Sequence, residues 1–573
     1  SDDSGKKWTK THDGFMDDIY YSYGYYFGQI RVNPINPRKV YIMGVPVLRS
    51  NDGGATFESI NEDNVHVDHH ALWVNPDQKG HLILGNDGGV NISYDEGDTW
   101  VKCNTPAVGQ FYTVAVDMDE PYNVYGGLQD NGVWTGPSTY EASYGWHNSG
   151  QYPYKSIMGG DGMQIAIDSR DNNTVYTGYQ FGNYFRINKQ TGDSEYITPK
   201  HELGDRPYRW NWQTPIHLSK HNQDILYMGS NHFHRSFDQG KTFETLSKKD
   251  LTKGGKKGDV AFGTLTTISE SPKRFGLLYV GTDDGFVHLS KDGGYSWERI
   301  SDQLPQDMWV TRVQASAHEE GRVLVALNGY RYDHFNVYLY ISDNFGKTWI
   351  KVGNGLPAEP VNVFKEDPVN PDLLYVGTDH GLYISLDRGK TFMQMNGGLA
   401  GASVHDLVVH PRDQELVIGT HGRSIYKTDI QYVQALVDSI TSQAFYAWDL
   451  ESIRHRNWGN AWSQWFPAED PEVTMPMFTQ SPGNVSVTLK MGSLEVHRFS
   501  TSVDAGLNFP IYNLAISESQ AKILEKEVNK EKEEKDQIKI KAADNGKYYL
   551  AKGDYEVILE LNGKKVTKTL KLE

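Results

Sequence analysis

Short apolar runs separated by polar, glycine-rich turns recur along most of the chain. A run ends in Asn-Pro or Asp-Pro, a second apolar run follows, and a glycine turn comes next; residues 31–43 and 363–377 are examples. Short apolar runs between turn residues predict β-strands. Four such strands in roughly every 40–50 residues indicate the blade of a β-propeller.

One polar pattern marks these units: Ser-x-Asp-x-Gly-x-Thr followed by Trp or Phe. We expect the Ser and Asp side chains to accept backbone N–H bonds inside a hairpin turn, and the glycine to adopt a positive φ. The aromatic ring is expected to pack between neighbouring sheets. Full copies begin at Ser50, Ser93, Ser236, Ser290 and Ser385, and variants begin at Ser1 and Ser342.

The spacing of the copies predicts the architecture. Counting backward from Ile430 places blade starts near residues 403, 361, 308, 258, 212, 159 and 108. Seven blades are common in one closed propeller, so we predict a seven-bladed propeller over residues 104–430. Two further blades, near residues 22 and 66, predict that 1–103 are the last blades of a second, N-terminal propeller whose earlier blades lie upstream. A single nine-bladed ring is the alternative.

The repeat stops after Ile430. Residues 431–483 are predicted to be a tryptophan-rich connector, and 484–573 again contain strand-like runs. We interpret 484–573 as a β-sandwich of fibronectin or immunoglobulin type. The predicted fold class is therefore all-β, with tandem seven-bladed propellers, the first one incomplete, followed by a C-terminal sandwich.

The charge and cysteine content of the chain limit the classes of partner and structure that we expect. The 573 residues include 73 acidic and 56 basic side chains, which gives a net charge of −17 without a basic stripe. Nucleic acid is therefore not an expected partner. The chain has one cysteine, Cys103, and no apolar run of 18 residues, so neither an internal disulfide nor a transmembrane helix is predicted.

Several longer motifs carry a family resemblance. They are Gly-Leu-Gln-Asp-Asn-Gly-Val-Trp at 127–134, Trp-Asn-Trp-Gln-Thr-Pro-Ile at 210–216, Gly-Thr-Asp-Asp-Gly at 281–285 and Gly-Thr-His-Gly-Arg-Ser at 419–424. Together with the repeats, they resemble a bacterial family of large Asp-box (BNR) proteins, described as glycosyl-hydrolase-like with sortilin-type repeats. The layout is also similar to that of xyloglucanase-type tandem propellers, in which sugar binds between the propellers.

The resemblance covers nearly the whole chain and implies further expectations. It implies blades that precede residue 1. We expect an extracellular, periplasmic or outer-membrane location in a bacterium, with any signal peptide outside the given chain; a cytosolic location is the alternative that the single cysteine leaves open. The cysteine-rich module of sortilin is absent from this sequence, which argues against receptor-type sorting.

Two predicted blades lack the Ser-x-Asp-x-Gly pattern, and there we expect the binding surface. Asp130 and Asp161 are the distinctive carboxylates of these blades and the candidates for catalysis. Turns between second and third strands, with aromatic insertions, supply the candidates for ligand contact, although Asp-Gly and Asn-Gly are also ordinary turn residues. These candidates are Gln129, Asn131, Trp134, Trp146, Gln180, Trp212, His232, Asp283, Asp284, His421 and Arg423.

Three functions fit the sequence. The first is an exported or cell-surface protein that binds a glycan or peptide on the propeller face or between the propellers. The second is an inverting glycoside hydrolase with Asp130 and Asp161 as its two carboxylates. The third is a structural component of an outer-membrane or cell-surface assembly.

Other chemistry has weaker support in the sequence. The histidines at 66, 69, 70, 232 and 234 lack the spacing of a metal site, so we expect no cofactor, with a structural calcium held by turn carboxylates as the alternative. A sialidase is disfavoured because Arg186-Ile187-Asn188 lacks the proline of the Arg-Ile-Pro motif.

Overall fold

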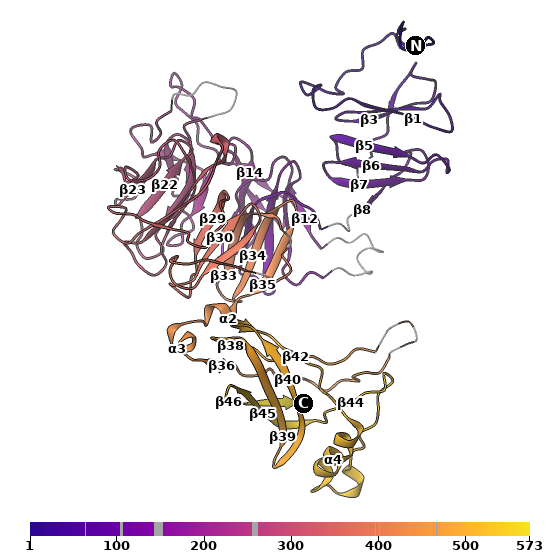
Figure 1. Cartoon of the computed structure of the whole chain (residues 1–573). Coiled ribbons are helices and arrows are strands. Elements are labelled where there is room, and N and C mark those ends of the chain that lie inside the picture. The colour runs from indigo at the N-terminus through magenta and orange to yellow at the C-terminus, as the bar shows by residue number, and fades with distance from the viewer. Residues whose placement is uncertain are drawn as a thin grey trace. The chain divides into compact units, whose positions relative to one another are not determined.

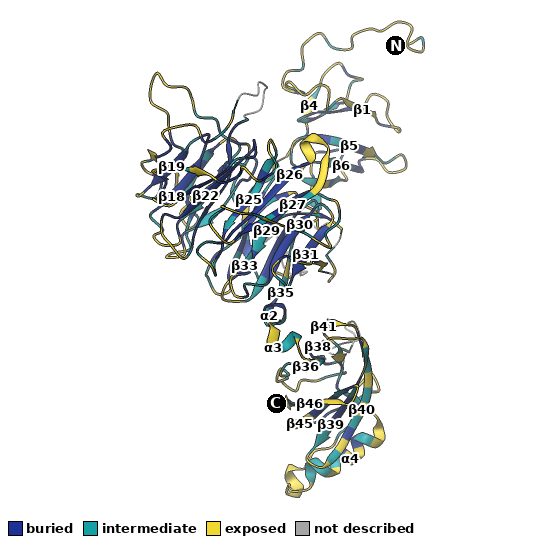
Figure 2. Ribbon diagram, turned by 60° about the vertical axis from the view of Figure 1, so that its left-hand side comes forward, coloured by how far each residue is buried: buried dark blue, intermediate teal, exposed yellow. Residues whose placement is uncertain are grey.

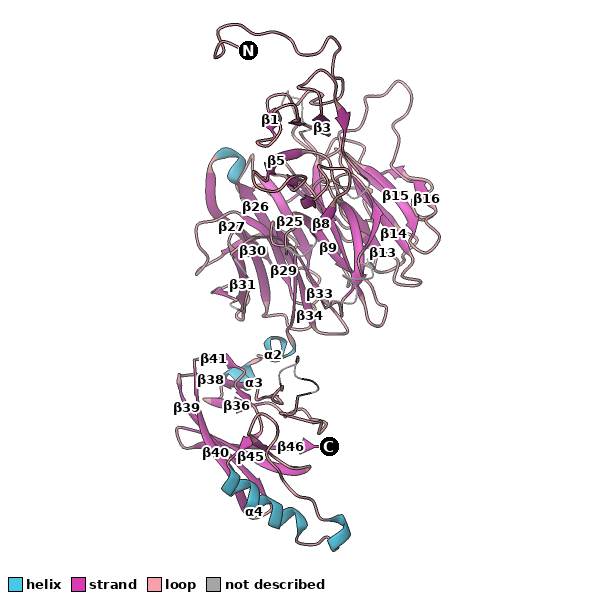
Figure 3. Cartoon of the chain, turned by 90° about the vertical axis from the view of Figure 1, so that its right-hand side faces the viewer, coloured by secondary structure: helices cyan, strands magenta, loops and turns pink. Residues whose placement is uncertain are grey.

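The computed structural model describes residues 1–62, 65–103, 107–141, 153–254, 262–395, 397–399, 401–461, 463, 465 and 468–573. The chain divides into two compact units, residues 1–428 and 429–573 (Figure 1). Both units are built mainly of antiparallel β-strands, and helices are confined to a few short segments (Figure 3). No helix within the described residues is long and apolar enough to cross a membrane.

The first unit consists of sheets in which consecutive strands pair in sequence order. Two four-stranded sheets come first: β1 (Gln29–Val32), β2 (Val40–Met43), β3 (Val47–Ser50) and β4 (Glu58–Ser59), then β5 (His69–Val74), β6 (Leu82–Asn86), β7 (Gly89–Ser93) and β8 (Val101–Cys103).

Seven more sheets follow within the described residues, six of four strands and a last one of three. Their strands are β9 (Phe111–Val116), β10 (Asn123–Leu128), β11 (Gly132–Pro137), β12 (Lys155–Met158); β13 (Ala166–Ile167), β14 (Thr174–Tyr179), β15 (Asn183–Asn188), β16 (Ser194–Tyr196); β17 (Ile216–Leu218), β18 (Leu226–Gly229), β19 (Phe233–Ser236), β20 (Glu244–Thr245); β21 (Leu265–Glu270), β22 (Leu278–Thr282), β23 (Val287–Ser290), β24 (Glu298–Arg299); β25 (Trp309–Ala315), β26 (Val323–Gly329), β27 (His334–Ser342), β28 (Ile350–Val352); β29 (Val361–Glu366), β30 (Leu374–Thr378), β31 (Gly381–Ser385), β32 (Met393–Gln394); and β33 (Ser403–His410), β34 (Glu415–His421), β35 (Ile425–Asp429). A 3₁₀ turn, η1 (Tyr330–Tyr332), lies between β26 and β27.

These seven sheets close into a ring. The first strand of each sheet contacts the first strand of the next, and β33 of the last sheet contacts β9 of the first. The closure also uses polar side chains: Thr113 Oγ1 donates to Asp406 Oδ2 at 2.9 Å, and Tyr122 Oη donates to Glu415 Oε2 at 2.7 Å. The arrangement is consistent with a β-propeller, which confirms the coarse prediction of an all-β fold built of small antiparallel sheets.

Burial explains the hydrophobic pattern. The second strands β22, β26 and β30 are buried along their whole length, whereas the fourth strands β20, β24 and β32 are exposed (Figure 2). A middle strand is covered on both faces by the neighbouring sheets, so it needs an unbroken apolar run. The core of this unit therefore lies in layers between adjacent sheets.

A glycine near the end of a second strand allows the next sheet to come close. A Cβ atom at Gly281 would lie 2.5 Å from Val310 Cγ1 of the next sheet, and one at Gly419 would lie 2.7 Å from Val114 Cγ1. Both distances are far inside van der Waals contact, and the β-branched valine side chains have little freedom to move away. At Gly419 this close approach joins the last sheet to the first.

The repeated turn forms the predicted hydrogen bonds. In the copy at Ser93, Gly97 N donates to Ser93 Oγ at 2.8 Å and Thr99 N donates to Asp95 Oδ1 at 2.9 Å. Trp100, which ends this copy, donates from Nε1 to the Ile60 carbonyl of the preceding sheet at 3.0 Å. The two backbone bonds also occur in the copies that begin at Ser50, Ser236, Ser290, Ser342 and Ser385.

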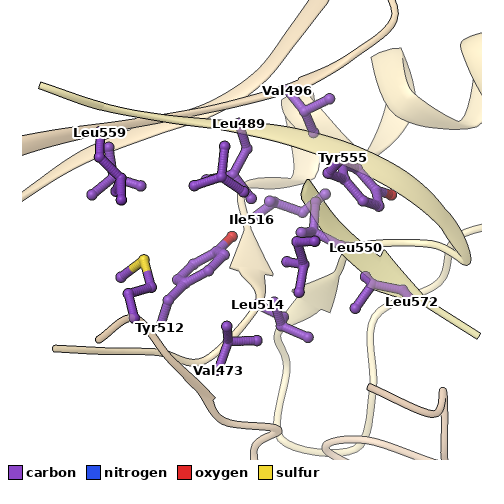
Figure 4. Close-up of a cluster of buried hydrophobic side chains, with 14 of the residues drawn as sticks. Val473, Leu489, Val496, Tyr512, Leu514, Ile516, Leu550, Tyr555, Leu559 and Leu572 are labelled. Atoms are coloured by element: carbon purple, nitrogen blue, oxygen red, sulfur yellow. The ribbon is translucent and has the colours of Figure 1, made fainter. Parts of the chain in front are cut away.

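The second unit has one main four-stranded sheet, in the order β40-β39-β45-β46, and three smaller ones. Side chains from all of them meet in one hydrophobic cluster (Figure 4). Residues 431–483, predicted to be a connector, contribute strands β36 to β38 to this cluster. The elements are α2 (Gln431–Gln434), α3 (Asp438–Thr441), β36 (Phe445–Ala447), β37 (Val473–Thr474), β38 (Met477–Thr479), β39 (Gly483–Met491), β40 (Leu494–Val503), β41 (Gly506–Asn508), β42 (Ile511–Tyr512), β43 (Ala515–Ile516), α4 (Glu518–Asn529), η2 (Glu534–Asp536), β44 (Tyr548–Tyr549), β45 (Gly553–Leu561) and β46 (Lys564–Leu572).

The first prediction concerns ring closure. We expect Gly419→Ala to lower the free energy of unfolding of the first unit by about 1–3 kcal/mol, because the new methyl group meets Val114. Gly397→Ala is the matched control, since a Cβ atom there would have no neighbour within 4 Å. Denaturant titration measures both variants. Equal stabilities for the two would contradict close packing at Gly419.

The second prediction concerns pH. Partial burial alone would raise the pKa of Asp95, but hydrogen bonds from Thr99 and Ser93 outweigh it and lower that pKa to about 2. The stabilisation is present above the unfolded pKa, near 4, and is lost as pH falls toward 2. Asp95→Asn should therefore lose less stability than the wild type between about pH 4 and 2. The fold should persist, because Asn344 occupies the same position in another copy.

Melting temperatures measured across that pH range test the second prediction, with Asp77→Asn, an exposed aspartate of the same sheet, as the control. An identical acid response of wild type and Asp95→Asn would contradict it.

Candidate functional site

The turn between β10 and β11 holds the first predicted catalytic residue. Asp130 adopts a left-handed conformation with φ of 55°, which Asp tolerates better than most residues. Three hydrogen bonds fix the turn: Gln129 N to Gln110 O at 3.0 Å, Asp130 N to Asp161 Oδ1 at 2.8 Å, and Asn131 Nδ2 to Gln129 O at 3.0 Å. The turn is therefore a rigid platform.

The structure brings Asp130 and Asp161 together from neighbouring sheets. The Asp161 side chain is only 2% exposed, and its backbone N donates to Gln180 Oε1 at 3.3 Å. Burial raises the pKa of Asp161, and the adjacent Asp130 carboxylate adds to the rise, while the Asp130 N–H lowers it. The hydrogen bond between them joins the Asp130 backbone to the Asp161 carboxylate, and the catalytic role of the two residues stays a prediction.

Exposed aromatic side chains lie beside this pair. Phe181 and Trp212 meet edge to face with ring centroids 5.2 Å apart, and Phe181 N donates to the Trp212 carbonyl at 3.3 Å. Trp212 is 37% exposed, and Trp134 is 36% exposed, with its Nε1 donating to the Asn131 carbonyl. Gln180 and Phe181 are consecutive in the β14–β15 turn, so this turn connects Asp161 to Trp212.

Two residues of this region were missed by sequence reasoning. Tyr112 of β9 interacts with Asp161, Asp130 and Trp212; burial raises its pKa, and Asp161 raises it further. His66, from the loop before β5, lies with Nε2 3.1 Å from the Asp130 carbonyl oxygen. No local motif marks either residue, because the contacts join segments far apart in the sequence.

The remaining predicted residues have different surroundings. Asp283 accepts hydrogen bonds from Gly263 N, Thr264 N and Thr264 Oγ1, and Asp284 accepts from Lys253 N and Gly254 N. Both carboxylates thus hold the loop that precedes β21. Their role in ligand contact stays a prediction.

Histidines and Arg423 complete the predicted set. His232 Nδ1 lies 3.1 Å from the Ser247 carbonyl, and His421 stacks on His405 with ring centroids 4.5 Å apart. Arg423 is exposed at the β34–β35 turn, and Trp146 lies outside the described residues. Among the described side chains, no group of three or more His, Cys, Asp or Glu is placed to hold a metal ion.

Comparisons with known proteins add little. No family model matches the chain, and no curated protein matches its sequence. Solved structures that match include the crystal structure of the GH74 enzyme of Niastella koreensis, with 13% identity, a TM-score of 0.25 and 84% of each chain covered. That likeness is too distant to assign an activity.

The third prediction tests whether the Asp161 carboxylate holds the 129–131 turn in place. Asp161→Ala leaves the Asp130 N–H without its acceptor, which should cost about 1–3 kcal/mol of stability and speed amide exchange at the 129–131 turn. Asp161→Asn keeps an acceptor oxygen and should retain slow exchange. Hydrogen-exchange mass spectrometry compares the variants; equal exchange in both would show that this bond does not hold the turn.

Proposed function

We propose that the protein binds a glycan on the side of the sheet ring that carries the 129–131 and 180–182 turns. The observation that supports this most is the exposed Phe181–Trp212 ring pair beside the hydrogen-bonded group of Asp130, Asp161 and Gln180. Aromatic rings give a sugar an apolar platform, and nearby polar groups fix its orientation. A rigid scaffold keeps both in place without a folding step on binding.

The finer architecture is part of the same proposal. We take the seven sheets from β9 to β35 as the blades of one propeller, with the glycan surface on the side where the first strands begin. The turns between second and third strands lie on that side, because each first strand is antiparallel to the second. The location that we propose with this function is extracellular, periplasmic or on the outer-membrane surface of a bacterium.

Glycoside hydrolysis is the second candidate, and one observation favours it. Asp161 is buried beside a second carboxylate, and burial raises its pKa, as in a carboxylic acid that donates a proton to a leaving group. The two functions differ in outcome. A glycosidase releases shortened products from a bound oligosaccharide and loses this activity in Asp161→Asn, whereas a binding protein leaves the oligosaccharide intact.

The fourth prediction tests the aromatic platform. Trp212→Ala should weaken binding of an oligosaccharide identified on a glycan array by roughly threefold to tenfold, because one ring contact is lost. Trp73→Ala removes an exposed tryptophan of β5 and should leave affinity unchanged. Isothermal titration calorimetry measures both. Equal affinities, or peptides bound in place of glycans, would contradict the proposal.

A further inference from the structure

A cavity of about 390 Å³ lies at the centre of the ring and is lined by residues from all seven of its sheets. Three cationic side chains face it: Lys220 after β17, Arg312 on β25 and Lys365 on β29. Three carboxylates line it as well: Glu270, Glu366 and Asp406.

Two of the cations share a single carboxylate. Arg312 Nη2 and Lys365 Nζ lie 3.4 Å and 3.5 Å from the same Asp406 oxygen, Oδ1. The other oxygen, Oδ2, accepts hydrogen bonds from Thr113 Oγ1 and Val114 N. Asp406 therefore neutralises one positive charge of the pair and leaves the second uncompensated.

Lys220 has no ion pair or hydrogen bond to any part of the chain that the structure describes. Lys220 is an exposed residue, and it lines the cavity. Burial lowers the pKa of Lys220, and the positive charge of Lys365 lowers it further. The two lysines therefore repel each other, an arrangement that costs free energy while the cavity holds only water.

His217, which also lines the cavity, supplies a second and independent observation. Its Nε2 atom is buried and has no hydrogen-bond partner among the described residues. A buried polar nitrogen without a partner is destabilising unless a ligand or water satisfies it. Burial lowers the pKa of His217 to about 4, so it is neutral near pH 7 and can donate one N–H without adding charge.

The other carboxylates at the cavity are engaged elsewhere. Glu366 Oε1 pairs with Arg322 at 3.2 Å, and Glu270 accepts hydrogen bonds from Ser219, Tyr227 and Gly276 N. Glu270 adds one negative charge. Counted over the whole lining, three cations face three carboxylates. The charges are unevenly paired, because Asp406 is shared between Arg312 and Lys365, and Lys220 has no ion pair among the described residues.

We propose that the central cavity binds a small oxyanion between Lys220, Lys365 and Arg312. The ligand class is a phosphate, a sulfate or a carboxylate, each of which offers several acceptor oxygens to converging cations. This site differs from the glycan surface. Lys220 and Lys365 stand at or beyond the ends of their first strands, whereas the 129–131 turn stands at the beginnings.

The test is calorimetric titration of phosphate, sulfate and glucuronate in a low-salt buffer free of other oxyanions. We expect saturable binding of one anion per chain. Lys220→Gln should weaken it by about tenfold or more, since a charged hydrogen bond is lost. Lys200→Gln, which removes an exposed lysine elsewhere on the unit, should leave it unchanged. Tighter binding of glucuronate assigns a carboxylate ligand, and tighter binding of phosphate or sulfate assigns an inorganic oxyanion.

Thermal unfolding without anions shows whether weaker binding by Lys220→Gln comes from the lost side chain or from a folding defect. Lys220→Gln should then melt at the same temperature as wild type or higher, because repulsion with Lys365 is removed. When anion is added, only the wild type and Lys200→Gln should show a saturable rise in melting temperature. No saturable binding to the wild type, or equal affinity in Lys220→Gln, would overturn the proposal. Sulfate and phosphate stabilise many proteins without a site, so an unsaturable rise in all three proteins would also overturn it.

Discussion

The close approach of each sheet to the next is the constraint on which the first unit depends. A ring of sheets holds only if its last member packs against its first as tightly as the others pack. At Gly419 the absence of a side chain admits Val114, and Asp406 then bonds across the same junction to Thr113. Thr113 and Asp406 are 293 positions apart in the sequence, so ring closure depends on long-range packing rather than local propensity.

Ring closure fixes both ends of the first strands and so creates two different chemical environments. At the beginnings of the strands, hydrogen bonds from the 129–131 turn to Asp161 hold a polar group beside exposed aromatic rings. Toward the other ends, Lys220 and Lys365 converge on one cavity. An apolar platform with acceptors suits a sugar, whereas converging cations suit an anion. The same scaffold therefore offers a surface for the proposed glycan site and a cavity for the proposed anion site.

Sequence patterns predicted the local structure well and the site only in part. The turn that begins at Ser93 makes the predicted bonds because all its donors and acceptors lie within a few residues. Asp130 and Asp161 were singled out because the segments that carry them lack this turn, and the structure brings the Asp130 N–H to the Asp161 carboxylate. Tyr112 and Lys220 were not predicted, because their neighbours come from other sheets: Asp161 and Trp212 for Tyr112, and Lys365 for Lys220. The backbone hydrogen bonds to Asp283 were not predicted either. The sequence of a turn that contains Asp does not show whether the carboxylate accepts hydrogen bonds from a distant loop.

The most direct measurement of the central claim is hydrogen-exchange mass spectrometry of the intact chain with and without a bound oligosaccharide. The account predicts added protection in the segments around residues 127–134, 160–164, 180–183 and 210–213, which belong to or adjoin three consecutive sheets of the ring. Protection confined to the repeated Ser-x-Asp-x-Gly turns, or to residues 429–573, would contradict it.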